Sequence, residues 1–292
     1  MKKVGYFFSS FLPFIIAVAA PYLAMALMIG VALVFLYVII PATKGGAGNT
    51  GELIALLMNM DFNTCIMLIY SIVCIVFFSL WYYHSCGGNF LPKPSRTFHI
   101  LEFLGVIVIV PGAQFFCNYL ISIISILFPK WLEQYEELLE TSGLASDTSL
   151  LMLCYAVILG PICEELIFRG ATMRQARKAV PFWLANILQA LLFGIFHMNW
   201  IQGIYAFALG LLLGFVCEIG GSIYYSILLH ILFNFSGTVL SSLLEGIEDT
   251  MFTRILMLLF TLVSLSVGMI LFVFGIKKKE ARNRRIASGP VS

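Results

Sequence analysis

Charge is what this sequence has least of. Only 11% of its 292 residues are Asp, Glu, Lys or Arg, and it has only four histidines, whereas 61% of the residues are hydrophobic. Soluble domains carry about a quarter charged residues, so this composition excludes an ordinary soluble globular domain. The seven cysteines show no paired spacing, which excludes a disulfide framework and a thiolate metal site.

Long apolar runs take the place of the missing charge. Because a helix needs about 20 apolar residues to cross a bilayer, we predict an all-α polytopic membrane protein with about eight transmembrane helices. The predicted spans lie near residues 15–40, 62–83, 99–127, 149–170, 181–199, 203–219, 222–243 and 255–276. The third span is over-long and contains Pro111–Gly112, which predicts a kink or a split.

The few charges that are present predict the orientation. Eight spans put both termini on the same side, and with that side inside, thirteen Lys and Arg residues flank the spans in the cytoplasm. Only Lys44, Lys130 and Arg254 lie outside, and Arg169 lies within a span. By the positive-inside rule both termini are cytoplasmic. The compact chain with short loops favours a bacterial plasma membrane.

Two charged segments are predicted to lie on the membrane surface. The tail "KKKEARNRR" is typical of a topology anchor that contacts anionic lipid, so we expect the bilayer and not a nucleic acid as its partner. The stretch "KWLEQYEELLE" has its apolar residues at helical spacing and predicts an amphipathic helix on the outer surface. These residues are Trp131, Leu132, Tyr135, Leu138 and Leu139.

The fourth predicted span carries three charges in the stretch "CEELIFRG". Each ionisable residue at membrane depth costs about 2.5–3.5 kcal/mol on insertion scales, so such residues are expected to pair. Glu165 and Arg169 are four apart on one helix face and can neutralise each other. Glu164 is rotated by about 100° from Glu165, so it remains for another role.

Two later spans each carry a polar group at this depth. His197 shares a helix face with Phe193, and His230 shares one with Asn234. A hairpin turn at Val180–Pro181 would bring these groups and Glu164 to compatible depths. Such residues can be structural helix contacts, but their number favours an intramembrane polar catalytic cavity. A carboxylate with imidazoles and an amide can activate water and stabilise an oxyanion.

A metal is an alternative use of the same groups. Glu164, His197 and His230 could bind a divalent ion such as zinc and leave a water position open. The sequence lacks the H-E-x-x-H signature of many zinc proteases.

Three motifs, "EELIFR", "FGIFH" and "HILFN", follow one another on successive spans. In this order they resemble the CPBP intramembrane protease family, which includes CAAX prenyl proteases and bacteriocin-processing and self-immunity enzymes. The resemblance covers about residues 149–243. It implies a membrane endopeptidase that hydrolyses a peptide bond in a membrane-associated or lipidated peptide or protein, in a cavity open to the cytoplasm. Family members are labelled metalloproteases, and a metal-independent glutamate mechanism is also argued for them.

The resemblance also implies a role for each motif residue. Glu164 would activate water, with Glu165 and Arg169 as its supporting pair. His197 would orient the water or bind a metal together with Glu164, and Phe193 would pack beside the site. His230 and Asn234 would stabilise the oxyanion or complete the ligand set.

The motifs also suggest a division of the chain into three regions. These are an N-terminal transmembrane region with three spans and the amphipathic helix (1–148), a protease core of four spans (149–243), and the last span with its basic tail (244–292). Two other functions remain open: a transporter that relays protons, and a non-enzymatic membrane regulator that binds partner proteins. The sequence does not predict the substrate or the oligomeric state.

Overall fold

The computed structural model describes residues 2–34, 37–38, 51, 55, 60–85, 100–142, 149–239 and 250–287. The first half of the described chain forms α1 (Lys2–Ser9), α2 (Leu12–Val34), α5 (Met60–Ser85), α7 (Ile100–Leu127) and α8 (Pro129–Thr141). A continuous helical segment follows, made of α9 (Leu150–Leu153), η2 (Cys154–Leu159), α10 (Gly160–Glu165), η3 (Leu166–Met173) and α11 (Arg174–Ala176). The remaining helices are α12 (Phe182–Phe196), α13 (Trp200–Gly220), α14 (Ile223–Val239) and α15 (Met251–Ala287).

The described chain confirms an all-α membrane architecture. Six helices are long and apolar enough to cross a bilayer: Lys2–Val34, Phe62–Ser85, Ile100–Leu127, Leu150–Ala176, Trp200–Gly220 and Met251–Arg284. The fifth and seventh predicted spans correspond to the shorter helices α12 and α14, with 15 and 17 residues. The fourth continues to Ala176, beyond the predicted end at residue 170, and residues 240–243 of the seventh lie outside the described residues.

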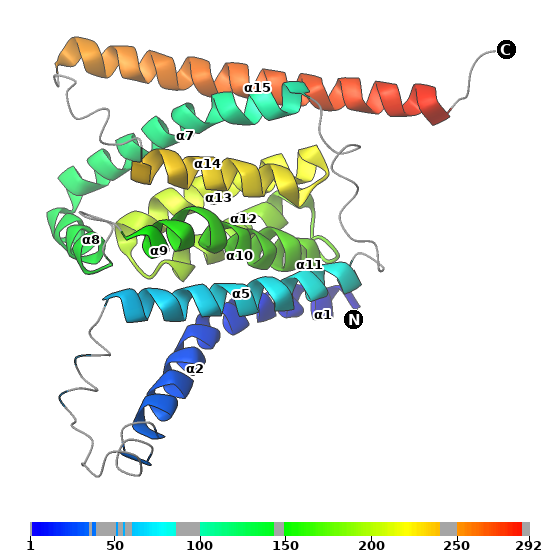
Figure 1. Ribbon diagram of the computed structural model, residues 1–292. Coiled ribbons are helices and arrows are strands. Elements are labelled where there is room, and N and C mark those ends of the chain that lie inside the picture. The colour runs from blue at the N-terminus through cyan, green and yellow to red at the C-terminus, as the bar shows by residue number, and fades with distance from the viewer. Residues whose placement is uncertain are drawn as a thin grey trace.

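The helices lie roughly alongside one another, with α15 next to α7 at one edge (Figure 1). The central layer holds α12, α13, α14 and the segment from α9 to α11, and α5 covers its other side. The later part of α2 diverges from this bundle. The amphipathic helix α8 lies at the end of the bundle opposite to α1 and to the last turns of α15, which agrees with its predicted place on the side opposite the termini.

Close packing of α7 against α15 depends on glycine. A Cβ atom on Gly105 would lie 2.6 Å from the backbone nitrogen of Phe272, and one on Gly268 would lie 2.8 Å from that of Ile109. Helices in a membrane associate through such small residues, because lipid gives no hydrophobic drive for their contact. These glycines therefore allow the backbones of α7 and α15 to touch.

The predicted split at Pro111 does not occur, because α7 continues through it as one helix. Ser264 of α15 bridges the backbone just after the proline: its hydroxyl donates to the carbonyl of Val108 and accepts from the N–H of Gly112. A side chain inserted in this way replaces an i to i−4 bond of the helix. This contact joins α15 to the backbone of α7 beside the proline, and sequence spacing does not reveal it.

Candidate active site

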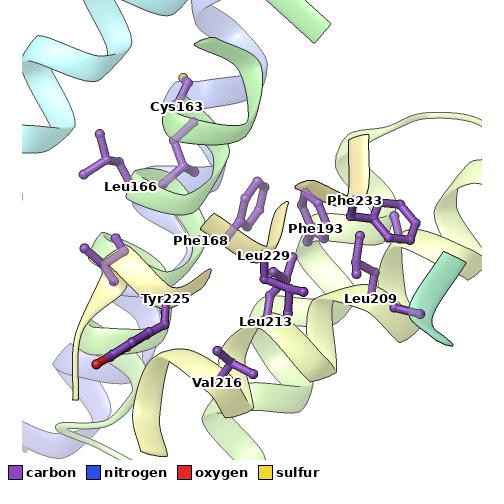
Figure 2. Packing of buried hydrophobic residues seen from close by; sticks show 14 of the residues in the cluster. Cys163, Leu166, Phe168, Phe193, Leu209, Leu213, Val216, Tyr225, Leu229 and Phe233 are labelled. Carbon is purple, nitrogen blue, oxygen red and sulfur yellow. The ribbon is translucent and has the colours of Figure 1, made fainter. Parts of the chain in front are cut away.

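The apolar core surrounds the predicted catalytic groups. Phe168 and Phe193 lie at its centre, with ring centroids 5.1 Å apart, and Leu213, Leu229 and Phe233 pack nearby (Figure 2). Such a setting has a low dielectric, so each buried polar group needs a partner.

The segment that carries Glu164, Glu165 and Arg169 is not a uniform α-helix. Two π-helical stretches, η2 and η3, flank the short α10 that ends at Glu165. A π-helix spaces its backbone hydrogen bonds one residue wider than an α-helix and often occurs at functional sites. Pro161, which has no N–H, lies in the first turn of α10 and fits this interruption.

The predicted pairing of Glu165 with Arg169 is confirmed. The Arg169 Nη1 donates to Glu165 Oε1 at 2.7 Å, and neither side chain is exposed. The other terminal nitrogen, Nη2, donates to the carbonyl of Gly210 on α13 at 3.2 Å. The pair is thus neutralised internally and fixed to a neighbouring helix.

His230 of α14 lies between the two glutamates. Its Nδ1 is 2.9 Å from Glu165 Oε1, and its Nε2 is 3.6 Å from Glu164 Oε2. An ionised carboxylate only accepts, so Nδ1 carries the hydrogen toward Glu165. The distance to Glu164 is too long for a direct hydrogen bond. The side chain of Glu164 is 18% exposed while that of Glu165 is fully buried, so only Glu164 can meet a reactant.

The ring of Phe193 on α12 lies between the two histidines and the arginine of the site. Its ring is edge-on to His197 at 4.9 Å and to His230 at 5.7 Å, and the Arg169 guanidinium lies 4.6 Å from its centroid. The Nδ1 of His197 lies 2.8 Å from the carbonyl of Phe193, so Nδ1 is the donor. A neutral His197 therefore has its lone pair on Nε2.

Asn234 makes a contact that its motif did not predict. Its Nδ2 donates to the carbonyl of Ala156 in the π-helical η2 at 2.8 Å. This bond ties α14 to the segment of Glu164. The amide keeps a second N–H and its oxygen, so the predicted role of Asn234 toward the reactant stays a prediction.

The prediction from sequence missed two buried polar residues of α12. Gln189 donates to the Gly210 carbonyl that also accepts from Arg169, and to the side chain of Asn186. Asn186 donates to the carbonyl of Leu211 at 3.0 Å. Space for this network exists because residue 214 is glycine, where a Cβ atom would lie 1.9 Å from Asn186 Oδ1. Asn186 and Gln189 are three residues apart in an otherwise apolar helix, and this spacing could have predicted that they lie together on one face.

A second buried charge cluster was also missed. Glu102 of α7 is fully buried, accepts from the hydroxyl of Tyr225 on α14, and lies 3.0 Å from the Nζ of Lys279 on α15. Sequence reasoning assigned Lys279 to the cytoplasmic tail. The cluster instead joins α7, α14 and α15. Tyr225, its residue on α14, lies five residues before His230.

The predicted metal ligands are Glu164, His197 and His230. Across the described residues, no three or more His, Cys, Asp or Glu side chains come together as a group that could hold a metal ion. The ligand set stays a prediction for which chelation is the test.

Comparison with known proteins identifies a family that part of the chain resembles. No curated protein and no solved structure matches the chain. A family model matches residues 146–236, which include all seven predicted site residues and overlap the predicted core at 149–243. The match confirms the predicted resemblance and supports, in general, an intramembrane endopeptidase. With the six apolar helices, it also supports an integral membrane protein. The family is that of type II CAAX prenyl endopeptidase Rce1-like proteins, and residues 146–236 of this chain are similar to it.

Proposed function

We propose that the protein is an intramembrane endopeptidase in which Glu164 activates water to hydrolyse a peptide bond of a membrane-associated or lipidated peptide. The contrast between two adjacent glutamates carries this proposal. Glu165 is fully buried and bound to Arg169 and His230, whereas Glu164 is partly exposed. One acid supports the site, and the other is left to act on a reactant.

The charges of the cluster suit a proton transfer. Glu164, Glu165 and Arg169 together carry one net negative charge when ionised, and a protonated His230 would make the group neutral. A buried group of balanced charge avoids the large cost of an uncompensated ion. When Glu164 takes a proton from water, the negative charge moves to the oxyanion beside protonated His230, so the group as a whole stays balanced.

Hydrolysis would follow in two steps. Glu164 takes a proton from water while the water oxygen attacks the carbonyl carbon of the peptide bond. The resulting oxyanion accepts from the remaining N–H of Asn234 and from the Nε2–H of protonated His230. Glu164 then gives the proton to the leaving amine as the carbon–nitrogen bond breaks, which restores the carboxylate.

His197 has a different part in this scheme. Its Nδ1–H is engaged by the Phe193 carbonyl, so Nε2 of the neutral ring accepts. We assign it to orient the attacking water by accepting its second hydrogen.

Glu164→Gln tests the proposal in purified protein in lipid nanodiscs with a pool of farnesylated and unmodified membrane peptides. We expect at least about a 100-fold loss of cleavage, the lower end for a general base. Glu133→Gln, the same change on the exposed side of α8, should cleave like the parent. A Glu164→Gln variant that is folded and fully active would overturn the assignment. A chelator arm tests the metal, and comparison of the two peptide classes tests whether a lipid group is required.

A further inference from the structure

His197 lies in the turn between α12 and α13, and the backbone of this turn is strained. Met198, the next residue, has a φ of 51°, in the left-handed region that non-glycine residues rarely adopt. Asn199 accepts from the N–H of Gln202 and so begins α13. Such a conformation persists only where its surroundings hold it.

Little protein packs against one side of this turn. An apolar groove of about 520 Å³ opens there, and its lining includes Met198, Asn199 and Trp200. Met198 is 66% exposed. Trp200 is itself 64% exposed, so the turn has few contacts to hold it and each contact of Trp200 counts.

A stack of three aromatic rings contacts the end of the turn. Phe128, the residue just before α8, stacks on Trp131 of α8 with centroids 4.2 Å apart and planes 16° apart. Trp131 in turn stacks on Trp200, the first residue of α13, at 5.3 Å and 17°. One helical turn further along α8, Tyr135 meets Tyr205 of α13 edge-on at 6.3 Å. The amphipathic helix is thus fixed to α13 at two points.

We propose that α8 acts as a clamp on the active site, with Trp131 as a positioning residue for His197. Trp131 stacks on Trp200 and holds it in place. Trp200, three residues after His197, in turn fixes the strained turn. The Nδ1 of His197 bonds to the carbonyl of Phe193 at the end of α12, so a shift of the turn re-aims its Nε2. The effect on catalysis rests on the proposed function, but the hold on the turn does not.

Hydrogen exchange in lipid nanodiscs tests the clamp without reference to activity. The N–H of His197 and that of Met198 bond to the carbonyls of Gly194 and Ile195, so their exchange reports opening of the turn. We expect Trp131→Ala to speed their exchange by about 5-fold, which corresponds to the loss of an aromatic pair worth about 1 kcal/mol. Trp131→Phe, which keeps a stacking ring, should restore most of the protection.

Trp183→Ala is the matched control. Trp183 is 61% exposed and stacks on Phe215 at 6.0 Å, at the opposite end of α12. This variant should leave exchange at the turn unchanged. Unchanged exchange in Trp131→Ala would overturn the clamp.

Kinetics of the same variants test the positioning role. Trp131→Ala should lower kcat by about 10- to 100-fold, as for a misplaced catalytic group, and leave KM within about threefold. Trp131→Phe should recover kcat. Faster exchange with an unchanged kcat would show that Trp131 is only structural and would overturn the positioning role. If the parent itself cleaves no peptide, the proposed function fails, while the exchange result still decides the clamp.

Discussion

Arg169→Met should strongly destabilise the protein, because it leaves the Glu165 carboxylate buried without its counter-charge. Both side chains are fully buried and 2.7 Å apart, and Arg169 also donates to Gly210. Removing one partner of a buried ion pair costs about 3–5 kcal/mol. The free energy of unfolding would be measured by detergent titration, followed by far-UV circular dichroism.

The double variant Glu165→Gln/Arg169→Met separates charge from packing. It removes both charges, and the new amide oxygen can still accept from His230. We expect a total loss below about 2 kcal/mol, since neutral replacement of a buried pair is often tolerated. Arg177→Met is the matched control: its pair with Glu218 is about a third exposed and should cost no more than about 1 kcal/mol. A double variant as unstable as the sum of the two single variants would refute this reasoning.

Three further results are expected. In a thermal-shift assay, Gly214→Ala should lose about 1–3 kcal/mol of stability, because the new Cβ overpacks against Asn186. Gly30→Ala is the control: its Cβ meets no atom within 4 Å, and its stability should change by no more than about 1 kcal/mol. Lys279→Met should lose roughly 3 kcal/mol because Glu102 stays buried, and the exposed Lys278→Met should not. A chelator should abolish cleavage if a metal completes the site and leave it intact if Glu164 acts alone.

Much of the site could be predicted because its groups lie at fixed spacing on single helices. Residues four apart share a helix face, so the pairing of Glu165 with Arg169 followed from position alone. The hairpin near Pro181 was local too, and the structure ends one helix at Ala176 and begins the next at Phe182. The meeting of these groups with His230 was inferred from depth, and the 2.9 Å contact with Glu165 confirms that it occurs.

Other features were not predictable because they join helices distant in the chain. Ser264 bonds to the backbone of α7 just after Pro111, and Lys279 pairs with Glu102. Trp131 meets Trp200 across 69 positions of sequence. None of these pairs leaves a pattern at a fixed spacing.

By itself, the sequence determined that this is an all-α membrane protein, that its fourth span carries three charges, and that Glu165 and Arg169 pair within that helix. These properties depend on composition and on the helical repeat, which act over a few residues. Only the tertiary structure decided which helix faces meet. Helices that are apolar on all sides carry no stripe to mark the face that packs, so small residues and single polar contacts select it. The packing of these faces pairs Glu102 with Lys279 and places Asn186 in the space that Gly214 leaves. It also stacks Trp131 of α8 on Trp200 at the start of α13.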